Sequence, residues 1–444
     1  MNTQQLQRDW FNDIVQQNAA LASAVDLPWL TQTREQAMHA ISRIALPERK
    51  QETWRYSDFG KLYQHAYHYQ HSAHETPAGS TVEDWIYDDS ASHRLVFVNG
   101  HFAPDISDIH ALPDQVIIGS LRTLLSSEPE KVSAWLALFD GDTTDVFNEL
   151  NRAFINDGLV IHVPENAVVD KPIEVVYLNV ADQQNLLCQP RSLVILEANS
   201  HARLVERYIG RGTSSYFLNG VTGISLAANA RLQHDRLQHE IRTAHHLSRI
   251  MLRQAAASEY RGINIATGAA WSRTDINSCF DGPHALCELD GLYTVGEQQY
   301  NDFHIDIRHN LPHCRSRENF KGIVYGNGRA VFDGRILVEK DAQKTDAQLT
   351  NRNLLLSQNG EVDTKPQLEI HADDVKCSHG TTVGKLDPAQ LFYLRSRGID
   401  ARQARKMICL GFAEQVLAQF EDDAVHDFVH ERIARLMDQQ VALL

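Results

Sequence analysis

Helical spacing of apolar residues marks the first part of the chain. Near the N-terminus, four of them recur at intervals that place them on one helix face: Leu6, Trp10, Ile14 and Val15. A second helical pattern runs from Thr33 to Leu46, and Pro47 ends it because proline cannot continue a helix. The sequence therefore predicts two amphipathic helices before residue 50.

An aromatic segment and a loop follow the second helical pattern, and residues 94–160 then have a mixed pattern. An aromatic segment begins at Trp54 and runs to Tyr69, and we expect 70–80 to form an exposed loop. A strand is predicted at Leu95–Val98, closed by the turn pair Asn99-Gly100. Two further helices are predicted, at 131–139 and 144–155.

From about Gly158 to Thr382 the chain contains many short strand-like runs separated by turns of small residues. The predicted strands include Leu159–Val163, Ile173–Leu178, Ser192–Leu196, Arg203–Tyr208, Gly223–Leu226, Ala330–Val338 and Gln367–Ile370. The turns recur about every 28 residues with no helix between them, which favours a stacked β-solenoid. An ordinary β-sandwich with strands of similar length remains the alternative.

After Lys385 the pattern is helical again. Asp387 and Pro388 are typical of a helix start, and Gly398 is typical of its end. Asp400 is the predicted cap of the next helix, which carries Ala404, Ile408, Phe412 and Leu417 on or near one stripe. A last amphipathic helix carries Val425, Phe428, Val429, Ile433 and Leu436. Such helices could cover the open edge of a solenoid, or they could serve as a docking surface.

Composition narrows the class of protein. The 444 residues include 42 Lys and Arg and 57 Asp and Glu, so the formal net charge is −15. An acidic chain without a basic stripe argues against a nucleic-acid partner, because it repels phosphates. The longest apolar runs are far shorter than the roughly 18–20 residues of a membrane span, and Met1–Gln17 contains no apolar export segment. We expect a cytoplasmic protein with no membrane and no nucleic-acid partner.

The candidate motifs for nucleotide binding lack required residues, and the sequence indicates no nucleophile for catalysis. Gly380–Leu386 has three residues between its glycines and a Leu after Lys385, whereas a P-loop needs four and a Ser or Thr. Gly326–Val331 lacks the third glycine of a dinucleotide fingerprint. The six cysteines include no C-x-x-C pair, and in a reducing compartment such scattered thiols are usually buried or reactive rather than bridged. No catalytic pair can be assembled from spacing alone.

Two groups of residues have metal-ligand chemistry. His304, Asp306 and Arg308 alternate on a predicted strand and would share a face. The favoured interpretation is a polar outer face of the solenoid, because strand faces exposed to water are normally polar. Cys377 and His379 would also point the same way, and a thiol with an imidazole suits iron or zinc. Two ligands make half a site, so a metal there needs a partner chain or distant residues; a structural role for the pair is the alternative.

A resemblance to a known family rests on three stretches. Residues 364–411, which include KPQLEIHADDVKCSHGTTVGKLDPAQLFYLRSRGI, closely resemble SufD-type members of the SufB/SufD family of SUF iron–sulfur cluster assembly scaffolds. LPERKQETWRYSDFGKL at 46–62 and LVFVNGHF at 95–102 are similar to that family as well. SufB tends to have EHEATTS where this chain has CSHGTTV, so the resemblance is to SufD.

The resemblance implies a non-enzymatic scaffold with a right-handed parallel β-helix flanked by helical regions. It implies pairing with SufB through the β-helix and binding of the SufC ATPase through the C-terminal helices, with Leu391, Tyr393 and Phe412 as candidate contacts. His379 and Cys377 would be ligands for iron or a transient iron–sulfur cluster at the SufB interface, completed by a SufB cysteine. No cofactor would be tightly bound by the isolated chain, which could form a homodimer when alone.

The expected organisation is an N-terminal helical and mixed domain at 1–157, a β-helix core at 158–383 and a C-terminal helical domain at 384–444. Two other functions remain open. One is a β-helix carbohydrate-active enzyme with acidic and basic residues along a groove, although such enzymes act mostly outside the cell. The other is a homodimeric β-helix scaffold unrelated to clusters.

Overall fold

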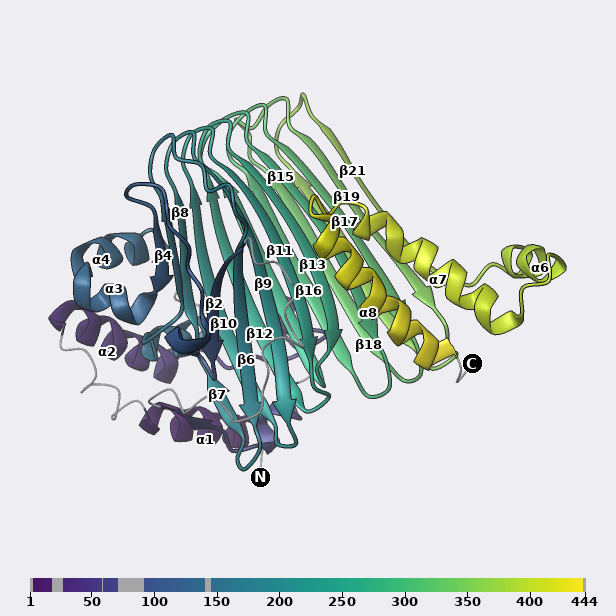
Figure 1. Ribbon diagram of the computed structural model, residues 1–444, viewed down its shortest axis with the longest axis horizontal. Coiled ribbons are helices and arrows are strands. Elements are labelled where there is room, and N and C mark those ends of the chain that lie inside the picture. Colours follow the sequence, from purple (N-terminus) through teal and green to yellow (C-terminus); the bar gives the residue numbers. More distant parts are fainter. Residues whose placement is uncertain (1–2, 18–26, 58, 71–91, 140–144, 442–444) are drawn as a thin grey trace.

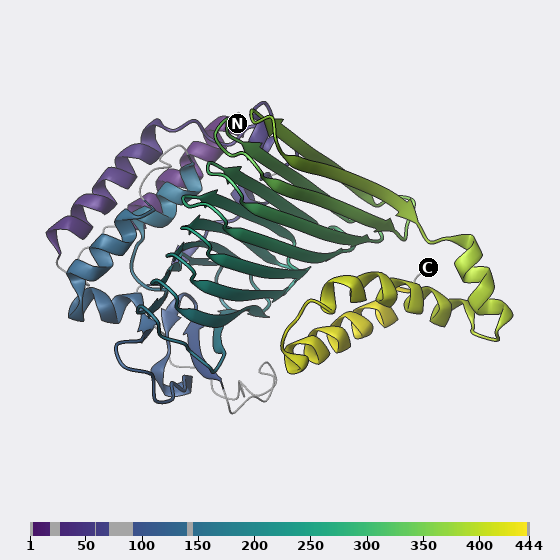
Figure 2. The same ribbon diagram turned by 90° about the horizontal axis from the view of Figure 1, so that it is seen from above.

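The computed structural model describes residues 3–17, 27–57, 59–70, 92–139 and 145–441. Its centre is a β-solenoid, in which the chain passes back and forth between two sheets and adds one strand to each sheet per coil (Figure 1). Helices from the N-terminal part lie at one side, and C-terminal helices lie at the other (Figures 1 and 2). The predicted loop at 70–80 lies almost entirely outside the described residues.

The two sheets have 11 and 10 strands. The 11-stranded sheet, called sheet A here, contains β4 (Ile117–Ser120), β5 (Leu159–Val163), β8 (Arg191–Leu196), β10 (Tyr216–Leu226), β12 (Ala244–Gln254), β14 (Trp271–Phe280), β16 (Tyr300–His309), β18 (Arg329–Val338) and β20 (Glu361–Ile370), with β1 (His68–Tyr69) and β7 (Leu186–Cys188) at its side. The 10-stranded sheet B contains β2 (His93–Val98), β3 (His101–Phe102), β6 (Ile173–Ala181), β9 (His201–Gly212), β11 (Arg231–Glu240), β13 (Glu259–Gly268), β15 (Leu286–Val295), β17 (Arg315–Val324), β19 (Asp346–Leu355) and β21 (Lys376–Lys385).

Strand pairing confirms the solenoid and rejects the sandwich. From β8 onwards, even-numbered strands stack in sheet A and odd-numbered strands stack in sheet B. Every pair in this part of the molecule is parallel, for example β16 with β18 and β19 with β21. Parallel neighbours need a crossover, and here the opposite sheet supplies it. The predicted ranges 1–157, 158–383 and 384–444 remain a prediction, although β2 from the first range pairs with β6 of the second.

A repeated corner explains the predicted turns of small residues. Asn166, Asn199, Asn229 and Ala257 all have φ between 55° and 62°, the left-handed region that Asn tolerates better than most residues. The three asparagines also stack, because Nδ2 of Asn199 donates to Oδ1 of Asn166 at 2.9 Å and Nδ2 of Asn229 donates to Oδ1 of Asn199 at 3.0 Å. Each coil therefore turns at the same place and supports the next.

N-terminal elements cover the outer face of sheet A. The helices are α1 (Thr3–Gln16), α2 (Pro28–Arg43), α3 (Leu121–Ser127), α4 (Pro129–Ala137) and α5 (Val146–Ala153). Trp10, Phe11 and Phe147 from these helices pack with Phe217 and Trp271 of sheet A in one apolar cluster. Helix α2 begins earlier than predicted because Pro28 occupies its first turn, and α3 was not predicted.

C-terminal helices cover the outer face of sheet B. They are α7 (Ala401–Leu417) and α8 (Asp423–Val441), and the exposed helix α6 (Pro388–Ser396) precedes them. The predicted caps are confirmed: the side chains of Asp387 and Asp400 accept hydrogen bonds at the starts of α6 and α7, and Gly398 has φ +85° after α6. No helix in the described part of the chain is long and apolar enough to cross a membrane.

The position of α7 and α8 corrects the idea that these helices close the end of the solenoid. Cys409, Ala413, Val416, Val425 and Val429 pack against the outward side chains of sheet B, including Val205, Leu237, Ile263, Leu292 and Ile323. The reason is that these strand positions are apolar on both faces, so the outer face itself needs a cover. The final coil, β20 and β21, is left almost without buried residues.

The backbone conformation of Ala257 at this corner leads to a prediction for the free energy of unfolding. Ala257 occupies the left-handed region at φ 55°, where its Cβ is strained, and it follows the stacked Asn229. Ala257→Asn should relieve part of this strain and extend the asparagine stack, raising the free energy of unfolding by about 0.5–1 kcal/mol. Urea unfolding of the two proteins measures the difference. A less stable variant would mean that the corner cannot hold the larger side chain.

Candidate functional site

The last strand of sheet B carries Cys377 and His379. Along the β19–β21 pair, Cys377 lies beside Ala347 and His379 lies beside Leu349. Ala347 and Leu349 are buried in the core between the two sheets. Because neighbouring positions of a parallel ladder share a face, Cys377 and His379 both point along the interior side of sheet B, at its end. The prediction that the two side chains share a face is confirmed.

The two residues differ in exposure. Cys377 is half-buried and packs against the core, whereas His379 is exposed. Burial raises the pKa of the Cys377 thiol, and the carboxylates of Asp346 and Glu318 raise it further. The thiol is therefore protonated at neutral pH, and a bound metal would have to displace its proton. Among the described residues, Cys377 and His379 belong to no group of three ligands with donor atoms within 4.8 Å of one another.

A buried carboxylate lies two coils behind this pair. Glu318 on β17 faces Leu349, which in turn faces His379. Its side chain is 1% exposed, and neither carboxylate oxygen has a hydrogen-bond partner of ordinary geometry. The hydroxyl of the neighbouring Ser316 instead lies 3.1 Å from Nε2 of the buried His309. Burial raises the pKa of Glu318 to about 8, so this group is mostly neutral at pH 7.

The other predicted group lies on the outer face of sheet A. His304, Asp306 and Arg308 share that face, as predicted, and their neighbours are charged. Nε2 of His304 lies 2.9 Å from Asp302, and Asp306 accepts from Arg308 at 3.0 Å. They line a polar groove that also contains Trp54 and residues such as Asp333, Arg335 and Lys365. The imidazole and carboxylates here are held by ion pairs, so the interpretation as a polar outer face holds.

The three candidate contacts on the C-terminal helices, Leu391, Tyr393 and Phe412, differ in what they pack against. Helix α6 buries none of its residues and projects away from the solenoid (Figures 1 and 2). On it, Leu391 is half-buried and Tyr393 is 57% exposed, while Phe392 is 75% exposed. Phe412 on α7 instead packs toward sheet B, with the ammonium of Lys321 4.4 Å from its ring centre. Phe412 therefore contributes to the contact between α7 and the sheet.

Comparison with family models accounts for nearly the whole chain. Residues 179–412 match the model of the SufBD core domain, described as SUF system FeS cluster assembly, and residues 5–175 match the SufBD protein N-terminal region. The chain belongs to the SufBD family.

Relatives within the SufBD family include proteins named SufD. The iron–sulfur cluster assembly protein SufD of Escherichia coli is 32% identical over 407 residues, covering 90% of this chain and 92% of the relative. A SufBD family protein of Synechocystis is 32% identical over 408 residues, covering 90% and 89%. SufD of Bacillus subtilis is 25% identical over 420 residues, covering 89% and 91%. The resemblance to SufD-type members is thus confirmed.

Sequence reasoning missed two features of this SufBD-family site. Glu318 was not predicted to be a buried carboxylate. It occupies an inward position of its strand, between Ser316 and Phe320, where alternation predicts a side chain in the core. Phe392 was passed over in favour of its neighbours Leu391 and Tyr393, because helical spacing alone does not say which face of α6 is free. Only the packing of α6 settles that Phe392 is exposed.

The raised pKa of Glu318 predicts how the free energy of unfolding changes with pH. Its folded-state pKa of about 8 is above the ordinary 4.5, so the folded state holds a proton that the unfolded state loses between these values. Stability should therefore fall as pH rises from 4.5 to 8. Glu318→Gln has no carboxylate to titrate, so its free energy of unfolding should not fall in this way. The free energy of unfolding of the variant minus that of the parent should therefore increase by roughly 2–4 kcal/mol between pH 5 and pH 8.

Chemical unfolding at the two pH values measures this difference. Glu339→Gln, at an exposed corner, is the matched control and should change by less than about 0.5 kcal/mol. Equal pH dependence in the parent and in Glu318→Gln would contradict the neutral state of Glu318.

Proposed function

We propose that this chain is a SufD-type scaffold subunit that pairs with SufB through the open end of its solenoid and binds the SufC ATPase through α6. In this proposal, Cys377 and His379 contribute to the interface with SufB, where iron or a transient iron–sulfur cluster is assembled. The observation that carries the proposal is the outer edge of the last described coil, which has no strand neighbour within the described residues. It presents a thiol and an imidazole at the edge of a SufBD-family solenoid.

Main-chain chemistry supports an interface at this end. Among the described residues, β20 and β21 are the last strands of their sheets, so each has one edge without a strand neighbour. An exposed strand edge of ten residues is a template for strand addition. A partner with the same solenoid architecture, such as SufB, could continue both sheets. The same end could pair with a second copy of this chain when SufB is missing.

Ligand chemistry supports cluster or iron binding at the interface. Thiolate is the usual cluster ligand, and substitution of an imidazole changes the properties of the cluster. The chain supplies one of each at this edge, and a cysteine from SufB would complete the set. His379 is exposed and free to swing toward a partner, whereas Cys377 is half-buried and must lose its proton first. In this proposal iron and sulfur are cargo, and the isolated chain holds no cofactor tightly.

The ligand role of His379 is tested by His379→Ala in anaerobic co-expression with SufB and SufC. The complex should remain intact, because the side chain is exposed, while its iron and sulfide content should fall at least about tenfold. His371→Ala is the matched control, since His371 is also exposed at this end and its ring lies 3.2 Å from the carboxylate of Glu369. An intact His379→Ala complex with normal cluster content would leave the chain a mechanical adaptor.

The exposed face of α6 supports SufC docking. Its aromatic side chains Phe392 and Tyr393 lie next to each other in sequence and are more than half exposed. Aromatic residues of this kind are enriched at the energetic centres of interfaces. Helix α6 follows β21 after two residues, so motion of α6 would be passed to the strand that carries Cys377. We infer that ATP-driven dimerisation of SufC moves the pair 388–397 and 401–420 and shifts the SufB interface.

Charge substitutions separate docking from packing. Tyr393→Asp and Leu391→Asp should abolish capture of SufC while the free energy of unfolding changes by less than about 1 kcal/mol. Phe412→Asp should cost about 2 kcal/mol or more, because it breaks the packing of α7 on sheet B. Co-purification and thermal unfolding measure the two effects.

Normal SufC capture by both α6 variants would remove α6 from the proposal.

The absence of catalysis and a cytoplasmic location belong to the same proposal. ATP hydrolysis would fall to the partner.

A further inference from the structure

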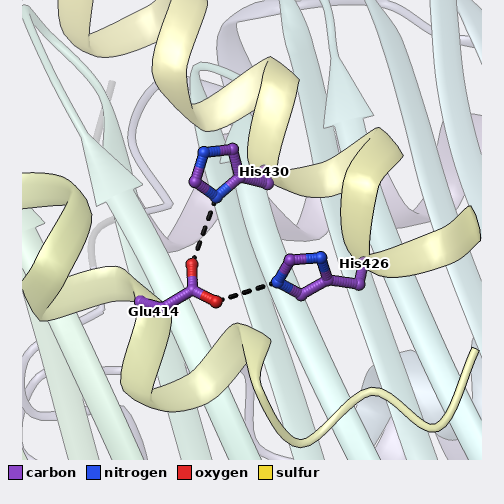
Figure 3. A group of neighbouring side chains, drawn as sticks. All are labelled: Glu414, His426 and His430. Atoms are coloured by element: carbon purple, nitrogen blue, oxygen red, sulfur yellow. Dashed lines mark hydrogen bonds and ion pairs between the residues drawn. The ribbon is translucent and has the colours of Figure 1, made fainter. Parts of the chain in front are cut away.

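Three potential metal ligands converge between α7 and α8. Glu414 comes from α7, and His426 and His430 come from α8 (Figure 3). One carboxylate oxygen of Glu414 lies 2.9 Å from Nε2 of His426, and the other lies 3.1 Å from Nδ1 of His430. Among the described residues, this is the only group of three such side chains whose donor atoms lie within 4.8 Å of one another.

Local structure explains the convergence. His426 and His430 are four residues apart, so they lie one above the other on one face of α8. Helices α7 and α8 are held together by buried residues on neighbouring turns, including Ala413 and Val416 of α7 and Val425 and Val429 of α8. Glu414 follows Ala413 directly, which places its carboxylate at the rim of this contact, opposite the two imidazoles. The arrangement is thus set by apolar packing and does not depend on the three polar groups.

The distances fit a metal ion. Ligand bonds of about 2.0–2.2 Å place neighbouring donor atoms roughly 2.8–3.1 Å apart around an octahedral ion and roughly 3.3–3.6 Å apart around a tetrahedral ion. The two contacts of Glu414, at 2.9 and 3.1 Å, are close to the octahedral spacing. Two imidazoles and one carboxylate are the set that binds zinc or non-haem iron with other positions open. We propose that Glu414, His426 and His430 bind one divalent transition-metal ion, Zn²⁺ or Fe²⁺, that links α7 to α8.

The surroundings suit such an ion. Nδ1 of His426 lies 3.0 Å from the carboxylate of Asp427, an arrangement that leaves Nε2 of the neutral ring free to bind the metal. The side chains of Glu414 and His430 are 41% and 42% exposed, so the ion can enter from solvent and keep water ligands. Hydrogen bonds from His426 and His430 lower the pKa of Glu414, so its carboxylate is ionised and ready to bind.

The alternative is an ion cluster without metal. The pKa of His426 is raised because Glu414 and then Asp427 accept hydrogen bonds from its ring, so a proton can occupy the place of the metal. An ion cluster would join the two helices without binding any metal ion. Direct measurement of metal binding therefore distinguishes the two.

The test uses the full chain, purified without a histidine tag and stripped with a chelator. Zn²⁺, and Fe²⁺ under anaerobic conditions, are titrated against a chromophoric chelator, with Mg²⁺ as the hard-cation comparison. We expect one Zn²⁺ or Fe²⁺ per chain, a raised melting temperature on binding, and no effect of Mg²⁺. Glu414→Gln and His430→Ala should each weaken binding at least about tenfold, and Asp427→Asn about tenfold.

The matched control is His284→Ala with His313→Ala. These two rings stack 4.7 Å apart at a solenoid corner, away from α7 and α8 in sequence, so their loss should leave affinity unchanged. Equal affinity in the parent, Glu414→Gln and His430→Ala would overturn the proposal, as would loss of binding only in the corner variant. The metal content of the untreated chain from cells, compared with His430→Ala, then tells Zn²⁺ from Fe²⁺. Circular dichroism confirms that each variant is folded.

Discussion

Main-chain pairing between successive coils is the constraint on which the rest of this structure depends. In a parallel solenoid every strand finds its hydrogen-bond partners on the coil before and the coil after. The register is continuous through sheet B, from Cys287 to Ser316, Ala347 and Cys377. The last coil has only a preceding neighbour in the described chain, so its outer edge is unsatisfied. That edge, by the same rule, is where Cys377 and His379 are presented.

The same stacking decides which polar groups the interior can hold. Glu206 is fully buried, and burial alone would raise its pKa, but hydrogen bonding by His234 and the charge of Arg236 lower that pKa to about 2. Glu318 has no such partners and is kept neutral by its surroundings. A buried carboxylate in this solenoid is therefore charged where a neighbouring coil supplies a cation, and neutral where it does not.

Helices cover part of each sheet and leave the last described coil uncovered. N-terminal helices pack on the outer face of sheet A, and α7 and α8 pack on the outer face of sheet B. Within the described chain, β20, β21 and the projecting α6 contain no buried residues, and two residues join β21 to α6. In the proposed function, a partner on α6 and a partner on the solenoid end would act on one continuous segment. A metal between α7 and α8 would stiffen the support of that segment.

The sequence by itself determined the architecture and the family. Recurrent turns such as Asn199 and Asn229 predicted the solenoid because each coil repeats the same local conformation, and Asp387, Gly398 and Asp400 marked helix ends through local hydrogen bonds. Strand alternation placed Cys377 and His379 on one face. Tertiary structure alone decided that α7 and α8 cover sheet B rather than its end, that Phe412 packs inward, and that Glu414 meets His426 and His430. These outcomes depend on contacts between segments far apart in the chain, and no local pattern records which apolar faces will meet.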